Sequence, residues 1–128
     1  MRLLLDTQLA IWWQIGATSL SEQTIRTVQA AEAVFISRAS LWEMAIKIGL
    51  GKLHIDLPRF AQQVEQSGFH WLDIETEHIL RLAQLPHSDD HKDPFDRLLI
   101  AQSLSEPLIF VTADKRLERY GSTIKIAP

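Results

Sequence analysis

The sequence predicts an α/β fold with a central, mostly parallel sheet of four to five strands flanked by helices. Three short apolar runs, residues 3–5, 34–36 and 108–111, are continuous and do not alternate with polar residues. This pattern is typical of strands that are buried on both faces of a parallel sheet. Helical periodicity fills the intervals between the runs, and strands that alternate with helices favour this fold class. We therefore expect one α/β domain over residues 1–128.

Weaker patterns predict the remaining elements. Apolar residues recur at helical spacing, three and four residues apart, over residues 9–13, 41–48, 79–83 and 95–99. Gly49 ends the second of these helices, and a further helix begins at about Pro58. Residues 69–74 are a weaker candidate strand, and residues 123–126 are expected to form an edge strand. The longest irregular segment, residues 85–96, is polar and rich in aspartate.

Composition narrows the class of protein. The 128 residues are 46% hydrophobic, include no cysteine and carry a formal net charge of −3. These values are typical of a packed globular domain that needs no disulfide. No apolar run approaches the roughly 20 residues of a membrane span, and Met1 and Arg2 lead directly into a strand, so we expect a cytoplasmic protein without a signal peptide. The negative charge argues against a generic basic nucleic-acid binder but is compatible with an enzyme that concentrates carboxylates around metal ions.

Acidic side chains recur at one kind of position, the junction where a predicted strand ends and a helix begins. They are Asp6, Glu43, Asp93, Asp96 and Asp114. Each one alone has a simpler explanation, because acidic residues cap helices and complement the helix dipole. Ser40 and Glu43 match the S-x-x-E capping box, as do Ser19 and Glu22, and Asp93 precedes a proline at a first helical position. At this point both roles, cap and metal ligand, stay open.

The topology of an open parallel sheet would bring these acids together. The carboxyl ends of all its strands lie on one edge, where ligand sites form. Carboxylates that are crowded in one cleft raise each other's pKa and repel unless a cation neutralises them. Oxygen ligands in a chain without cysteine favour Mg²⁺ or Mn²⁺ over zinc. If the acids converge, the sequence predicts a divalent-cation site at this edge.

Four segments together resemble the PIN-domain ribonucleases, and most closely the VapC-type toxins of type II toxin–antitoxin systems. They are LLLDT at the start of the chain, SRASLWEMAIKIGLGKL in the middle, and DPFDRLLIAQSL and LIFVTADKRLERYG near the end. No segment is specific alone, and the resemblance depends on their order and spacing from Arg2 to about Gly121. It implies a PIN-like fold over residues 1–128 and metal-dependent hydrolysis of RNA, with Mg²⁺ as the cofactor and Mn²⁺ as the alternative.

The resemblance also implies roles for individual residues. The family's acidic quartet falls on Asp6, Glu43, Asp96 and Asp114. Within it, the expected metal ligands are Asp6, Asp96 and Asp114. Asp93 is the alternative to Asp96, because DPFD offers two acids one helical turn apart. Thr112 matches a polar residue that helps to orient the site, and Gln8 departs from the histidine or asparagine expected after Asp-Thr.

RNA, an antitoxin protein and a second copy of the chain are the partners that the resemblance implies, with no membrane. Basic residues that could meet the RNA backbone are Arg38, Lys47, Lys52, Lys92, Arg97, Lys115 and Arg116. Arg97 and Arg38 are the best placed of these and, with Thr112, are the predicted substrate-binding residues; ordinary solvated surface is the alternative for each basic residue. Trp12 and Trp42 either pack in the core or line an apolar groove for an antitoxin segment.

Other functions fit the sequence less well. A phosphatase of the haloacid dehalogenase type requires a second aspartate two residues after the first, where this chain has Gln8. A receiver domain requires an acid pair near the first strand, and none follows Leu5. A catalytically silent PIN-like module that binds RNA or protein is the main alternative, and the four acids argue against it. His87 and His91, with two aspartates between them, are a second candidate metal site or simply a polar loop.

Overall fold

The computed structural model contains a sheet of five parallel strands in the order β3-β2-β1-β4-β5. The strands are β1 (Arg2–Leu5), β2 (Ala33–Ser37), β3 (His70–Leu72), β4 (Ile109–Thr112) and β5 (Ile124–Ile126). The structure describes residues 1–87 and 93–128. The predicted α/β class and parallel sheet are confirmed, and both of the weaker candidate strands form the edges of the sheet.

The apolar runs form strands because their side chains are buried on both faces of the sheet. In the central strand β1, Leu3 and Leu5 point into one core cluster and Leu4 points into the other. Leu3 pairs with Val34 of β2 and with Ile109 of β4. Each face of the sheet thus receives a layer of aliphatic side chains, and all three leucines of β1 are at most 1% exposed.

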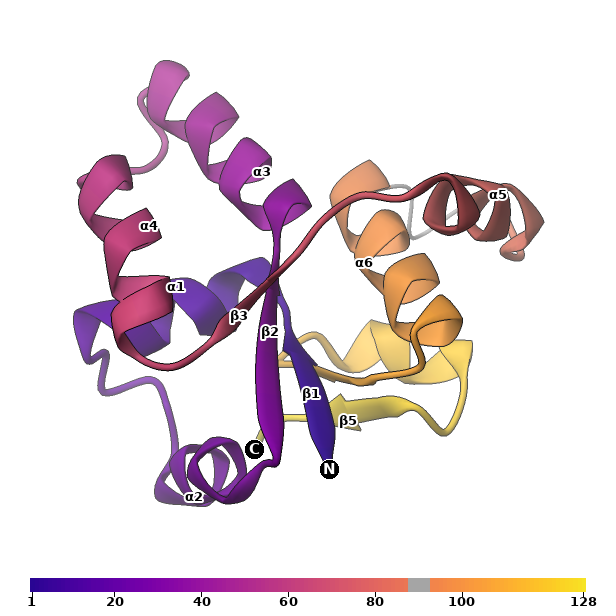
Figure 1. Cartoon of the computed structure of the whole chain (residues 1–128), viewed down its shortest axis with the longest axis horizontal. Helices are drawn as coiled ribbons and strands as arrows, with labels where there is room; N and C mark the ends of the chain where they lie inside the picture. Colours follow the sequence, from indigo (N-terminus) through magenta and orange to yellow (C-terminus); the bar gives the residue numbers. More distant parts are fainter. Residues whose placement is uncertain (88–92) are drawn as a thin grey trace.

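Helices cover both faces of the sheet. They are α1 (Thr7–Ile15), α2 (Glu22–Ala30), α3 (Arg38–Gly49), α4 (Leu57–Gln66), α5 (Thr76–Gln84), α6 (Pro94–Ser105) and the 3₁₀ helix η1 (Lys115–Tyr120). Figure 1 shows α1 and α4 to the left of the strands and α5 and α6 to the right. Ile11 and Phe60 belong to the first core cluster, and Leu99 and Leu117 to the second. In the part of the chain that the structure describes, no helix is long and apolar enough to cross a membrane.

Helix α3 begins three residues before the position that the capping-box pattern predicts. The Ser37 hydroxyl accepts a hydrogen bond from the Ala39 amide (3.0 Å) and caps the helix. Ser40 and Glu43 therefore lie inside α3, and the prediction that they form a capping box is wrong. The earlier start moves Glu43 out of the first turn and into the second, on a face that contacts α1.

Helix α2 shows a similar shift. Its cap is Ser21, whose hydroxyl accepts a hydrogen bond from the Thr24 amide (3.1 Å). The predicted pair of Ser19 and Glu22 is therefore not a capping box, because Glu22 is already the first residue of the helix. A hydroxyl two residues closer to the helix satisfies the free amide instead.

The path of the chain through the sheet reverses between β1 and β4. From β1 the chain continues to β2 and β3 on one side, and it then crosses to β4 and β5 on the other. At such a switch point the connections after two neighbouring strands diverge and leave a crevice outside the carboxyl ends of the strands. Asp6 directly follows β1, and Asp114 lies two residues after the end of β4, so the fold brings both acids to this crevice.

Candidate active site

Asp6 caps a helix and lines the crevice at the same time. Its amide donates to the carbonyl of Val111 (3.0 Å), which holds the end of β1 against β4. Its Oδ1 accepts a hydrogen bond from the Leu9 amide (2.7 Å) as the N-cap of α1, and its Oδ2 accepts one from the Thr112 hydroxyl (2.5 Å). Asp6 is 7% exposed. A strand, a helix and a hydroxyl together therefore fix the orientation of this carboxylate.

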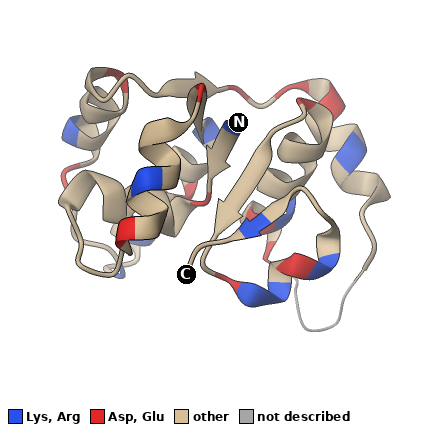
Figure 2. Cartoon of the chain, turned by 90° about the horizontal axis from the view of Figure 1, so that it is seen from below, with Lys and Arg blue, Asp and Glu red and all other residues tan. Residues whose placement is uncertain are grey.

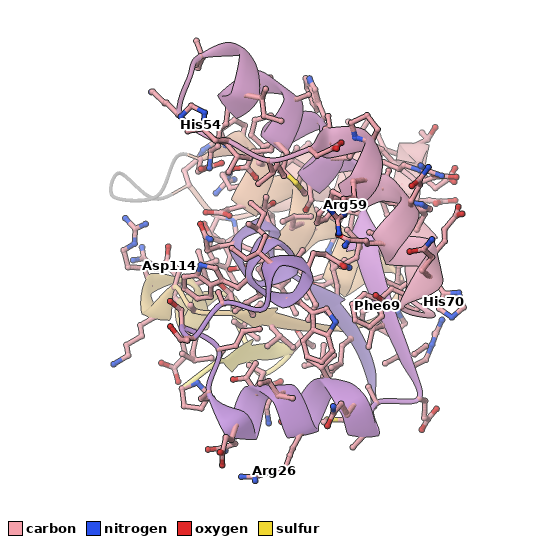
Figure 3. All side chains as sticks on the ribbon, turned by 90° about the vertical axis from the view of Figure 1, so that its left-hand side faces the viewer. Arg26, His54, Arg59, Phe69, His70 and Asp114 are labelled. Atoms are coloured by element: carbon pink, nitrogen blue, oxygen red, sulfur yellow. The ribbon has the colours of Figure 1, made fainter. Side chains whose placement is uncertain are left out.

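Thr112 connects Asp6 with Asp114. It is fully buried at the end of β4, and its hydroxyl accepts a hydrogen bond from the Asp114 amide (3.1 Å) while it donates to Asp6. Asp114 caps η1 and forms a two-pronged ion pair with Arg116, with Nε–Oδ1 and Nη2–Oδ2 distances of 3.0 and 2.8 Å. In Figure 3, Asp114 lies on the opposite edge of the molecule from His70 of β3. Thr112 thus sets the positions of two acids at once.

Glu43 reaches the site from α3. Its Oε1 accepts a hydrogen bond from the Thr7 hydroxyl (2.7 Å), and its Oε2 lies 3.0 Å from Nζ of Lys47. The Thr7 hydroxyl lies 2.9 Å from the Ser40 hydroxyl. Sequence reasoning missed Thr7 and Ser40 as site residues. The spacing of Ser40, Glu43 and Lys47, three and four residues apart, indicates that these three side chains share one face of a helix, and this pattern could have identified Ser40.

The two acids of DPFD have different tasks at the start of α6. Oδ1 of Asp93 accepts hydrogen bonds from the amides of Phe95 (2.8 Å) and Asp96 (3.2 Å), and Pro94 occupies the first position of the helix. The predicted cap at Asp93 is confirmed. Asp96 lies in the first turn of α6, three residues after Asp93, and lines the cavity.

One cavity of about 340 Å³ brings the acids together. The five carboxylates that line it are Asp6, Glu43, Asp93, Asp96 and Asp114. Thr7, Gln8 and Ile11 of α1, Lys47 of α3 and Ala113 complete the described lining. All five acids that the sequence singled out therefore share one cavity at the switch point, although they come from four separate chain segments.

Comparison with known proteins shows the family. The family model of the PIN domain matches residues 3–122. This chain belongs to the PIN-domain family. Ribonuclease VapC22 of Mycobacterium tuberculosis (strain ATCC 25618 / H37Rv) is 24% identical to this PIN domain over 126 residues, which cover 91% of this chain and 90% of that protein. The family predicted from the four sequence segments is confirmed.

Solved structures share the fold of this PIN domain. A chain of a toxin-antitoxin complex from Klebsiella pneumoniae matches it with a TM-score of 0.68 and 18% identity, covering 98% of each chain. A chain of DNA-bound VapBC from Salmonella typhimurium matches with a TM-score of 0.66 and 20% identity, covering 100% of this chain and 99% of that one. At these identities the likeness concerns the fold alone.

The buried carboxyl at the centre of this PIN domain is electrostatically unfavourable when ionised. Burial raises the pKa of Asp6 above its ordinary value of 3.8, and the negative charge of Glu43 raises it further. Hydrogen bonds from the Thr112 hydroxyl and from the amides of Leu9 and Ala113 act in the opposite direction. The net pKa is raised, so a cation in the cavity would favour the ionised form of Asp6.

The donor chemistry of the cavity suits a hard divalent cation that keeps part of its water shell. The ionisable groups that line it, among the described residues, are five carboxylates and one ammonium, without histidine. In residues 1–87 and 93–128, no group of three or more His, Cys, Asp or Glu side chains is arranged so that it could hold a metal ion. Mg²⁺ usually takes one or two protein carboxylates together with several waters, so an open wall of acids fits it better than it fits a structural zinc ion.

The basic residues favoured from the sequence lie away from the cavity. Arg97 donates to the Tyr120 hydroxyl (3.1 Å), and Arg38 pairs with Asp73 (3.0 Å). Neither arginine lines the acidic cavity, whereas Lys47 does. Figure 2 shows the lysines and arginines spread among aspartates and glutamates along the ribbon. The structure thus places one of the seven predicted basic residues, Lys47, on the described wall of the cavity.

The two tryptophans predicted to flank the cleft have different surroundings. Trp12 of α1 is half-buried and packs against the first core cluster. Trp42 of α3 is 56% exposed and contacts Phe95 edge-on, with 5.0 Å between the ring centroids. Of the second candidate metal site, His91 and the aspartates before it lie outside the described residues, as does Lys92.

Proposed function

We propose that this PIN domain is a metal-dependent endoribonuclease and the toxin of a type II toxin–antitoxin pair. The observation that carries the proposal is the single cavity lined by five carboxylates at the β1–β4 switch point. Helix capping alone does not require five acids to share one cavity, where burial and a neighbouring charge raise the pKa of Asp6. The name of the mycobacterial relative, a ribonuclease, supports the same chemistry.

Hydrolysis of a phosphodiester requires an attacking water, a polarised phosphate and a ribose oxygen that leaves. A Mg²⁺ or Mn²⁺ ion in the cavity would lower the pKa of a water molecule that it binds and would stabilise the charge on the phosphate. Asp6, Asp96 and Asp114 would hold the cation, with Asp93 as the alternative to Asp96. Glu43 accepts a proton from the attacking water as the new bond to phosphorus forms, and the leaving ribose oxygen takes a proton from solvent as its bond breaks.

We assign Thr112 a positioning role in this mechanism. The sequence placed it among the substrate-binding residues, but it is 0% exposed and its hydroxyl is occupied by Asp6 and Asp114. A side chain without exposed surface cannot contact an RNA strand. Its contribution is to hold two metal-binding carboxylates in fixed orientations, which lowers the cost of assembling the site.

A cleavage assay tests the proposed chemistry. Purified wild type, Asp6→Asn and Asp96→Asn are incubated with total cellular RNA in Mg²⁺, in Mn²⁺ and in EDTA, and circular dichroism checks that each protein is folded. We expect cleavage by the wild type in either metal, none in EDTA, and a large loss of cleavage in both variants. Undiminished cleavage in EDTA or by folded Asp96→Asn would contradict the mechanism. A folded, metal-binding wild type that cleaves no RNA would favour the silent binding module.

We also propose an antitoxin partner, a homodimer and a cytoplasmic location for this activity. The solved relatives in complexes with antitoxins support the first. Trp42, Ile46 and Leu50, exposed at four-residue spacing along α3, give an apolar surface beside the cavity wall.

Expression of the wild type alone should arrest growth, whereas Asp96→Asn expressed to the same level should not. Harmless expression of an active wild-type nuclease would contradict the toxin role.

A further inference from the structure

Among the described residues that line the acidic cavity, Lys47 is the one cation, and the proposed hydrolysis assigns it no role. It lies on α3 one helical turn after Glu43, and its Nζ is 3.0 Å from Oε2 of Glu43. The Lys47 side chain is 45% exposed, whereas that of Glu43 is 8% exposed. The ammonium thus reaches from the mouth of the cavity toward a nearly buried carboxylate.

Stability does not account for this ion pair. A pair with one half-exposed partner contributes little to folding, because solvent screens the attraction and ordering a lysine side chain costs entropy. Glu43 already accepts a hydrogen bond from the Thr7 hydroxyl (2.7 Å) through its other oxygen. An ammonium offers three donors on a flexible stem, and Glu43 is the one ion-pair partner that the described residues provide for it.

The three arginines among the predicted RNA contacts already have partners. Arg116 is paired through two nitrogens with Asp114. Arg38 is paired with Asp73, and Arg97 donates to Tyr120 and to carbonyls of the 85–86 segment. A phosphate that enters the acidic cavity would therefore meet one described lining residue able to neutralise it, Lys47.

We infer that Lys47 is a catalytic residue of this site, which binds a non-bridging oxygen of the scissile phosphate. The inference rests on the proposed ribonuclease function. Without RNA, the ammonium neutralises Glu43 and lowers the repulsion among the acids of the cavity. When RNA enters, the ammonium turns from Glu43 to the phosphate, because the phosphate brings a further negative charge into the cavity and the half-exposed, flexible lysine stem can move to meet it. Glu43 is then released to accept the proton of the attacking water.

Lys47→Met tests the inference, because methionine keeps a flexible chain without the charge. Lys47→Arg keeps the charge, and Lys125→Met is the matched control that removes a lysine from edge strand β5, outside the cavity. Single-turnover cleavage is measured at saturating RNA and metal. Mn²⁺ affinity is measured separately without RNA. Lys47→Met should lower the cleavage rate about 100-fold to 1000-fold, as removal of one transition-state donor does. Lys47→Arg should stay within about tenfold of the wild type, and Lys125→Met should equal it.

The Mn²⁺ measurement separates phosphate binding from support of the metal site. If Lys47 competes with the cation for Glu43, Lys47→Met should bind Mn²⁺ at least as tightly as the wild type. Weaker Mn²⁺ binding by Lys47→Met would overturn the inference, because the lysine would then act by organising the acids. Equal cleavage rates of Lys47→Met and an active wild type would overturn it too and leave the ribonuclease proposal intact. A wild type that cleaves no RNA would overturn both.

Discussion

The carboxylate of Asp6 uses one oxygen to cap helix α1 and the other to accept a hydrogen bond from Thr112 at the end of β4. Whether an acid after a strand is a cap or a ligand was an open question in the sequence, and here the two roles are compatible. The hydrogen bond to Leu9 orients the group, and burial makes its charge unfavourable unless a cation is close. Asp93 and Asp114 combine capping with a place on the cavity wall in the same way.

The raised pKa of Asp6 predicts a pH-dependent stability. A raised pKa means that the folded state binds the proton more tightly than the unfolded state. The stability from this group is complete below its ordinary value of 3.8 and is lost as the pH rises through the raised pKa of the folded protein. Asp6→Asn keeps a cap oxygen without this titration. In EDTA, the unfolding midpoint of the wild type should therefore fall relative to Asp6→Asn as the pH rises. A difference that does not change with pH would contradict the prediction.

Removal of the Thr112 hydroxyl is expected to lower both the stability of the fold and the affinity for metal. Thr112→Val leaves the Asp114 amide without its buried acceptor and removes a hydrogen bond that lowers the pKa of Asp6. We expect a loss of about 1–3 kcal/mol in the free energy of unfolding and weaker metal binding at neutral pH. Denaturant titration and metal titration measure the two effects. Thr112→Ser keeps the hydroxyl and should preserve both properties, and equal behaviour of the two variants would contradict the role of the hydroxyl.

At the scale of elements, the two acids at the start of α6 are expected to have different roles, one in the stability of the helix and one in metal binding. Asp93 accepts the first amides of the helix, whereas the Asp96 carboxylate lines the cavity from the first turn. Asp93→Ala should cost about 1 kcal/mol of stability through loss of the cap. Asp96→Ala should change metal-free stability by less than that while abolishing metal binding. Thermal unfolding in EDTA and a metal titration check the pair, and a larger stability loss in Asp96→Ala would reverse the assignment.

A buried polar network joins α3 to α6. Oε1 of Gln102 accepts a hydrogen bond from the Ser37 hydroxyl (2.6 Å), and its amide nitrogen lies 3.3 Å from the carbonyl of Asp73 and from Nδ1 of His78. Gln102→Leu would leave the Ser37 hydroxyl proton without this acceptor, while Ser37 Oγ keeps the Ala39 amide and His78 Nδ1 keeps the Glu75 amide. We therefore expect a loss of about 1–3 kcal/mol in the free energy of unfolding. Denaturant unfolding measures it. A near-neutral effect would show that water replaces the amide.

Strands were predicted from the sequence more accurately than helix starts, for physical reasons. Short continuous apolar runs have few ways to be buried other than in a parallel sheet, and each predicted run became a strand. The start of α3 was predicted wrongly because Ser40 precedes Glu43 at the spacing of a capping box, whereas Ser37, which caps the helix, has no acid at that distance. The tertiary contact of Glu43 with Thr7 decided between them, and no local pattern contains that contact.

At the scale of the whole molecule, the strand order creates the site. The acids were identifiable from the sequence because they follow strand ends, but their convergence depends on β1 lying next to β4, 106 residues apart at the Asp6–Thr112 contact. The direction of a long side chain depends on its neighbours in the same way. Arg97 adjoins Asp96 in the sequence but turns to Tyr120, whereas Lys47 reaches the cavity from another helix.

The central claim is that the five acids form one cation site, and a metal titration of the free protein tests it most directly. Thermal unfolding of the wild type, Asp96→Asn and the control Asp73→Asn, an exposed acid outside the cavity, is followed with Mn²⁺ and with Mg²⁺. We predict that metal at about 100 times its Kd stabilises the wild type and the control by about 2.7 kcal/mol, and that Asp96→Asn gains far less. Equal stabilisation of all three proteins, or none of the wild type, would contradict the claim.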